Sequence, residues 1–142
     1  MNISAVACAI LSLVPHLDPA RAESQAAIIG MLAMTVEDAA TAVVNGAHES
    51  GFGVDYERCV LRGDGGDGLY GLGVGYQEYA CAAPEVQTRM ALKAMHDKGF
   101  PEKPLRAFRG YLGAHSDRWP EARARLSLWI LTVERIKCAC SF

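Results

Sequence analysis

Glu49 is the residue whose type and position best suit acid–base chemistry. Apolar residues recur at helical spacing from Val36 to Ala47, and Gly51 follows as a C-terminal cap, so Glu49 is predicted to lie in the last turn of a helix. The negative end of the helix dipole and partial burial would both raise the pKa of the Glu49 carboxyl. An acid that keeps its proton near neutral pH can protonate a glycosidic oxygen. A solvated surface glutamate is the alternative from position alone.

The following segment offers further carboxylates in Asp55, Asp64 and Asp67. The last two stand in the run Gly-Asp-Gly-Gly-Asp-Gly over residues 63–68, and Asp-Gly pairs suit tight turns. We therefore expect turn residues here rather than a second catalytic carboxylate. The same run fits a G-x-G-x-x-G pattern, but more glycines follow it instead of the helix that dinucleotide binding requires.

No arrangement of histidine, cysteine or carboxylate has the spacing of a metal site. His48-Glu49 lacks the second histidine of a zinc-protease motif, because position 52 is phenylalanine. Two aspartates are too few for a calcium loop, and Cys138 and Cys140 stand too close for a usual zinc pair. We expect no metal and no cofactor.

Prolines and capping residues divide the rest of the chain into helices. Residues 3–14 form an apolar helix, and Asp18-Pro19 opens a second that runs to about Met34. On the helix that ends at Glu49, small apolar side chains form one narrow face. The polar residues Glu37, Thr41, Asn45 and His48 lie on the other side.

Three prolines open the later helices, at Pro84, Pro104 and Pro120; the first ends at Gly99 and the second at Tyr111. The last helix has a predicted buried stripe of Ala122, Leu126, Trp129, Ile130, Val133 and Ile136.

A glycine-rich segment separates the two groups of helices. From Phe52 to Ala83 the helical period is lost and short apolar pieces alternate with glycines, which predicts a small β-hairpin lobe. The chain is thus one α+β, mainly α domain over residues 1–142: N-terminal helices (1–34), the helix of Glu49 (35–51), the glycine-rich lobe (52–83) and C-terminal helices (84–142). A cleft between the lobes is the expected ligand position.

Composition narrows the function classes. The 142 residues are 51% hydrophobic and 21% charged with a net charge of −2, which disfavours a general nucleic-acid binder. The apolar N-terminal run is too short to span a membrane, and no basic residue precedes it, as a signal peptide would need. Among the five cysteines, Cys59 and Cys81 flank the glycine-rich lobe and form either a disulfide or two free thiols.

Three motifs together resemble a known family. Residues 47–52, Ala-His-Glu-Ser-Gly-Phe, resemble the helix-ending Glu-Ser motif of lytic transglycosylases and related phage lysozyme-like domains. Residues 68–74, Gly-Leu-Tyr-Gly-Leu-Gly-Val, resemble the glycine-rich stretch that follows in that family. Residues 107–113 resemble the segment that carries a tyrosine facing the glutamate. The family's glutamine is replaced, with Gln77 three residues beyond Val74, and its asparagine is Leu112.

The resemblance implies a lysozyme-like fold that cleaves peptidoglycan glycan strands, with Glu49 as catalytic acid and base. It leaves open a lytic transglycosylase, which forms an anhydro-sugar, and a lysozyme-type muramidase. The implied substrate-binding residues are Ser50, Leu72, Gly73, Tyr76, Gln77 and Tyr111. Because two motif positions differ, a non-catalytic wall-binding or virion-type structural module on the same fold is the alternative.

The same resemblance implies a setting and a partner. The partner is the glycan strand of the bacterial cell wall, with no nucleic acid and no membrane insertion, and we expect a monomer. Because no export signal is recognised, the chain resembles phage endolysins, which are released at lysis or carried in a virion. The last third of the chain contains five arginines that would give it a basic surface: Arg106, Arg109, Arg118, Arg123 and Arg125. Such a surface would suit the acidic peptide stems of peptidoglycan. The alternative is an ordinary solvated helix face.

Overall fold

The computed structural model describes residues 1–63, 66–113 and 118–140 and is mainly helical. The elements in chain order are α1 (Ile3–Leu13), α2 (Pro19–Leu32), α3 (Val36–Glu49), α4 (Val54–Glu57), β1 (Arg62–Gly63), β2 (Gly66–Asp67), the 3-10 helix η1 (Gln77–Tyr79), α5 (Pro84–Asp97), α6 (Pro104–Tyr111) and α7 (Trp119–Lys137). Asp64 lies outside the described residues, so its assignment to a turn stays a prediction.

Helix α2 begins at the predicted Asp18-Pro19 pair, and α3 begins at the predicted boundary near residue 35. Asp18 accepts a hydrogen bond from the Ala20 amide at 3.1 Å at the start of α2, and Thr35 accepts one from the Asp38 amide at 3.1 Å at the start of α3. Helices α5, α6 and α7 each have proline in the first turn, where its missing N–H costs no helical hydrogen bond. The positions of the long helices were therefore readable from local sequence.

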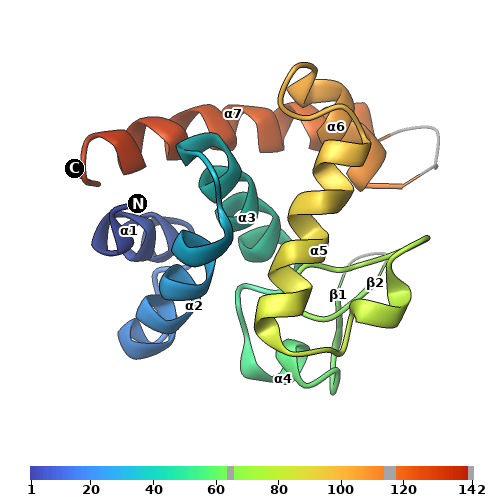
Figure 1. Cartoon of the computed structure of the whole chain (residues 1–142), viewed down its shortest axis with the longest axis horizontal. Coiled ribbons are helices and arrows are strands. Elements are labelled where there is room, and N and C mark those ends of the chain that lie inside the picture. Colours follow the sequence, from blue (N-terminus) through green and yellow to red (C-terminus); the bar gives the residue numbers. More distant parts are fainter. Residues whose placement is uncertain (64–65, 114–117, 141–142) are drawn as a thin grey trace.

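Helix α3 is the central element, and it packs against α1, α5 and α7. Figure 1 shows α1 and α2 on one side of it, α5 and α6 on the other, and α7 running along the top of the view. The predicted polar side of α3 is only partly correct: His48 is exposed, whereas Thr41 and Asn45 are buried. Neighbouring helices cover that side as well, so these polar groups bond internally.

Helix α7 also departs from its predicted stripe. Ala122, Val133 and Ile136 are buried as expected, but Ile130 is 53% exposed. Arg125, which was predicted to be part of a basic surface, is buried instead, and so is Thr132. Because α7 packs on α1, α3 and α6 at different points along its length, its buried residues do not all lie on one straight stripe. The residues that meet α3 include polar ones.

The glycine-rich segment contains the predicted hairpin, though a minimal one. Strands β1 and β2 pair antiparallel over two residues each, and Asp67 forms a further bridge with Leu72. Turns and short helices make up most of the remainder. Its core consists of Leu69, Tyr70 and Leu72, which are buried against the helices. Hydrophobic anchoring rather than a sheet therefore gives this lobe its shape.

Two disulfides close the molecule. Cys59–Cys81 confirms one of the two sequence alternatives and brackets the glycine-rich segment. Cys8–Cys140 joins α1 to the chain after α7 and was not predicted. The two ends lie side by side in Figure 1. Cys138 is exposed. Within the described ranges, no helix is both long and apolar enough to cross a membrane.

Candidate active site

Glu49 is buried at the end of α3, as its pattern predicted, and it has a partner that the sequence analysis missed. Its side chain is 3% exposed, and the Arg125 Nη2 donates a hydrogen bond to its Oε1 at 2.8 Å. The Arg125 Nη1 donates to Asn45 Oδ1, one turn earlier on α3, at 2.9 Å. The guanidinium thus holds the last turn of α3 at two points.

The ion pair changes the electrostatics expected for Glu49. Burial disfavours its charged form, as expected, but the adjacent guanidinium favours that form. Arg125 was assigned to a basic surface, and that assignment is wrong, since its side chain is 4% exposed. A helical signal was present, because Arg125 stands three residues after Ala122 and four before Trp129, on the predicted stripe.

Gly71 lies directly against the Glu49 carboxylate. A Cβ at position 71 would stand 2.4 Å from Glu49 Oε2, and the backbone there is left-handed, with φ +60°. Both features require glycine, since a side chain would be strained and would collide with the carboxylate. The glycine-rich segment therefore touches the candidate acid through bare backbone.

Tyr111 completes this cluster. Its hydroxyl donates to the Tyr70 carbonyl at 2.5 Å, immediately before Gly71 in the chain. Burial raises the pKa of Tyr111 well above its usual range, and the negative charge of Glu49 raises it further, while Arg125 opposes them. Tyr111 is thus a neutral hydrogen-bond donor within electrostatic reach of Glu49.

Ser50 links the end of α3 to the glycine-rich segment. Its hydroxyl donates to the Leu69 carbonyl at 2.7 Å and accepts from the Phe52 amide at 3.0 Å. Phe52 has a left-handed backbone, φ +57°, and its ring packs where a Cβ on Gly46 would stand, 2.2 Å from Cζ. These contacts turn the chain back under α3, and they give Ser50 a structural task in addition to its predicted substrate contact.

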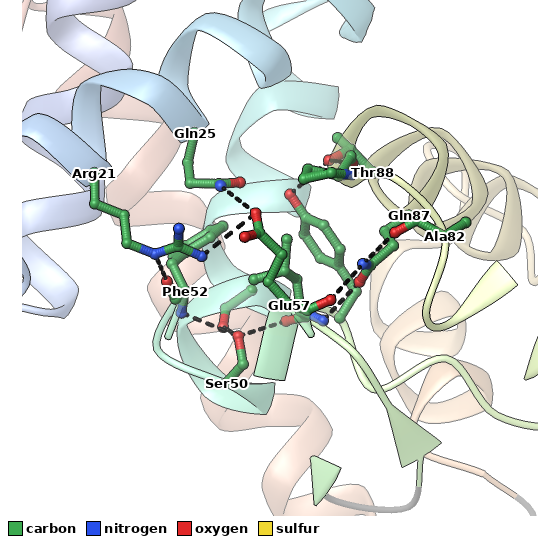
Figure 2. Close-up of polar contacts among 12 residues, drawn as sticks. Arg21, Gln25, Ser50, Phe52, Glu57, Ala82, Gln87 and Thr88 are labelled. Atoms are coloured by element: carbon green, nitrogen blue, oxygen red, sulfur yellow. Dashed lines mark hydrogen bonds and ion pairs between the residues drawn. The ribbon is translucent and has the colours of Figure 1, made fainter. Parts of the chain in front are cut away.

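A polar network holds the other side of the segment, as Figure 2 shows. Arg21 of α2 donates to the Phe52 carbonyl and pairs with Glu57 at 3.6 Å. Gln87 of α5 is fully buried; its amide donates to the Ala82 carbonyl at 2.8 Å, and its oxygen accepts from the Leu69 amide at 2.8 Å. Side chains from α2 and α5 therefore anchor the backbone of the segment that meets Glu49.

A groove of about 550 Å³ opens beside this cluster. Leu72, Gly73, Tyr76 and Tyr111, four of the six predicted substrate-binding residues, line it, together with Gly71. Gln77 and Ser50 do not line it: Gln77 accepts a hydrogen bond from the Gly75 amide at 2.9 Å.

The other lining residues are Val74 of the glycine-rich segment and seven from α5, α6 and the chain around them: Ala94, Lys98, Arg109, Gly110, Leu112, Gly113 and Arg118. No group of three metal-ligating side chains occurs in the described parts of the chain. Comparisons with models of known families, with curated proteins and with solved structures find no match.

Proposed function

We propose that this protein cleaves the glycan strand of peptidoglycan on a lysozyme-like fold, with Glu49 as general acid and base. The observation that supports this most is the position of Glu49: a buried carboxylate held by Arg125 and touching Gly71, which lines the groove. Tyr111, whose pKa responds to the Glu49 charge, lines the same groove. Glu49 itself does not line the groove, and a strand lying there would reach its carboxyl only past the backbone of Gly71.

In this proposal Glu49 gains and loses a proton in one catalytic cycle. The Glu49 carboxyl gives its proton to the glycosidic oxygen as that bond breaks, and its resulting negative charge is stabilised by Arg125. The carboxylate then takes the proton of the sugar's 6-hydroxyl as that oxygen closes on the anomeric carbon. Water in place of the 6-hydroxyl gives the muramidase reaction instead.

The groove residues have matching roles in this proposal. The Tyr76 ring offers a face on which a sugar ring stacks, and the backbone of Leu72 and Gly73 offers hydrogen-bonding groups along the strand. Burial and the bond to Asp97 raise the pKa of Tyr76 to about 12, so its hydroxyl stays neutral. Substrate contacts by Ser50 and Gln77 remain predictions.

The disulfides support action outside a reducing cytoplasm. Cys59–Cys81 and Cys8–Cys140 both form in oxidising compartments and persist there. We propose that the protein acts on the bacterial wall in the periplasm or beyond it, as a phage-encoded lytic protein or an enzyme carried in a virion would.

The test is wall clearing by the full chain and by Glu49→Gln, with Glu134→Gln as the matched control. Glu134 lies on the exposed side of α7, so the control removes the same charge away from the groove. In Glu49→Gln the amide oxygen can still accept the hydrogen bond from Arg125, but the side chain can no longer give or take a proton. We therefore expect activity to fall by roughly 100- to 10,000-fold, which is the usual loss when acid–base catalysis is removed.

A second variant, Glu49→Asp, keeps the charge of the pair but shortens the side chain by one methylene and so displaces the carboxyl from Gly71 and the groove behind it, so it should also lose most activity while remaining folded. Mass spectrometry of the products distinguishes anhydro-sugars from hydrolysed ends. Equal clearing by Glu49→Gln and the wild type, or no clearing by a folded wild type, would refute the proposed function.

One observation favours the second candidate, a non-catalytic wall-binding module. A buried carboxylate that is bonded to arginine is also a common structural ion pair. In that case the wild type binds glycan strands and releases no product, and Glu49→Gln changes thermal stability but not strand binding.

A further inference from the structure

Asn45 is a buried polar residue of α3 to which the proposed reaction gives no role. It stands four residues before Glu49, so the two side chains lie one above the other on the same face of the helix. Arg125 of α7 reaches both of them: its Nη1 donates to Asn45 Oδ1 at 2.9 Å, and its Nη2 donates to Glu49 Oε1 at 2.8 Å. All three side chains are buried, so both hydrogen bonds form away from solvent.

Packing alone does not explain an asparagine at this position. Its Nδ2 finds no hydrogen-bond partner in the described parts of the chain, and a buried donor without a partner is destabilising. An apolar side chain of similar size would avoid that cost. The Asn45 oxygen, in contrast, is the acceptor for one of the two terminal nitrogens of Arg125. Because the amide is neutral, it accepts this bond without competing with Glu49 for the guanidinium charge.

The hydrogen-bonding chemistry of Arg125 restricts where the proton of Glu49 can be. A guanidinium group carries only donors, so the protonated oxygen of a carboxyl group cannot face it. Because Arg125 holds Oε1, the proton of the neutral Glu49 carboxyl must be on Oε2. Oε2 is the oxygen next to Gly71, where a Cβ would stand 2.4 Å from it, and Gly71 lines the groove. The proton therefore lies on the side of the carboxyl that meets the groove-lining backbone.

We propose that Asn45 is a positioning residue: it engages Nη1 of Arg125, so that the guanidinium binds one oxygen of Glu49 and leaves Oε2 to give and take the proton. The inference rests on the proposed function and adds the residue that gives the two carboxyl oxygens different roles. Without an acceptor at position 45, Nη1 would turn to Oε2 and form the two-point contact that guanidinium and carboxylate groups favour. Both oxygens would then face donors, and neither could carry the proton.

Arg125 is the charged group that acts most directly on Glu49. Tyr111 of α6 stays neutral, because burial holds its pKa well above its usual range, and α1 carries no acidic or basic side chain. His48 of α3 and Glu121 of α7 are exposed, so water screens their charges. The titratable groups that α2 and α5 bring into ion pairs have other partners: Arg21 with Glu57, Lys93 with Asp97, and His96 with Asp38. A substitution at Asn45 should therefore reach Glu49 through Arg125.

The test follows the titration of the Glu49 carboxyl carbon by NMR in the full chain, with Glu49→Gln to assign the signal. Asn45→Asp adds a carboxylate that competes for Arg125 and repels the Glu49 charge, so Glu49 should bind its proton about tenfold more tightly. Asn45→Leu frees Nη1 for Oε2, so Glu49 should bind its proton about tenfold more weakly.

Thr41→Val is the matched control. Thr41 is buried one turn before Asn45 on the same face of α3, and its hydroxyl donates within the helix to the Glu37 carbonyl at 2.9 Å. The control thus removes a buried polar group without touching Arg125, and it should leave the Glu49 titration unchanged.

The pH profile of wall clearing gives a second readout. Asn45 does not line the groove, so its variants should change kcat and leave KM as it is. A general acid acts in its protonated form, so on the alkaline limb kcat should be about tenfold lower in Asn45→Leu and should persist to higher pH in Asn45→Asp. A role in stability alone would not move the two profiles in opposite directions.

The inference is overturned if Glu49 titrates in Asn45→Asp as it does in Thr41→Val, or if both Asn45 variants move the titration in the same direction. The NMR measurement needs only folded protein, so Asn45→Asp, which keeps the shape of the side chain, decides the question alone if Asn45→Leu does not fold. Wall clearing with an unmoved titration would overturn the inference and leave the proposed function standing. Opposite shifts without any clearing by the wild type would support the inference and refute the catalytic assignment.

Discussion

Gly71 permits the sharpest test of the reasoning about Glu49. Replacing it with alanine puts a methyl carbon 2.4 Å from Glu49 Oε2 and 2.8 Å from Cδ. The backbone of position 71 has little freedom to retreat: the preceding carbonyl accepts the Tyr111 hydroxyl, and the Leu72 amide donates to the Asp67 carbonyl at 3.0 Å. The carboxylate itself must therefore move.

The magnitude follows from two separate costs. A left-handed alanine costs about 1–2 kcal/mol. Ordinary contact begins at 3.4 Å, so Oε2 must move by about 1.0 Å, from 3.4 − 2.4, and a shift of that size away from Arg125 takes Oε1 out of hydrogen-bond distance from its present 2.8 Å. Breaking a buried pair costs about 3 kcal/mol or more. Gly71→Ala should thus lose about 4–5 kcal/mol of unfolding free energy, and about 100-fold of activity from the misplaced acid.

Gly75 supplies the matched control in the same segment. Its φ of +88° is also left-handed, but nothing lies within 4 Å of a Cβ there. Gly75→Ala should therefore lose only about 1–2 kcal/mol and keep its wall-clearing activity. The melting temperature of Gly71→Ala should be roughly 10 °C below that of the control, taking about 3 °C for each kcal/mol.

A double-mutant cycle identifies the cause. In a Glu49→Ala background the colliding carboxylate is gone, so Gly71→Ala should cost only about the 1–2 kcal/mol of backbone strain. Urea unfolding of the four proteins measures the coupling between the two positions. Equal stability and activity of Gly71→Ala and Gly75→Ala, or no coupling in the cycle, would show that the carboxylate is not held against this backbone.

Two further predictions concern pH and the disulfides. Because burial holds the pKa of Tyr111 well above its usual range, the unfolded chain loses that proton first. The free energy of unfolding should fall as the pH rises above about 10, and Tyr111→Phe should reduce the slope by about 1.4 kcal/mol per pH unit in urea titrations. Replacing Cys59 and Cys81 by serine opens a loop with a sequence separation of 22, which should cost roughly 3 kcal/mol in thermal unfolding, whereas Cys138→Ser should change little. A flat alkaline profile, or equal melting of the two cysteine variants, would contradict these arguments.

Local sequence determined the helices and the position of Glu49 on them. Capping by Asp18 and Thr35, prolines at the starts of α5 and α6, and glycines after the helix ends act within a few residues, so they can be read without tertiary information. The same locality placed Glu49 in the last turn of α3 and indicated a short hairpin in the glycine-rich segment.

Only the tertiary structure decided what surrounds that turn. Arg125 meets Glu49 across 76 positions of sequence, and Cys8 meets Cys140 across 132. A helical pattern predicts that a face is buried but not what covers it, so the burial of Asn45 and the exposure of Ile130 depended on how α7 lies along the other helices. The groove depends in the same way on segments that meet only when the chain is folded.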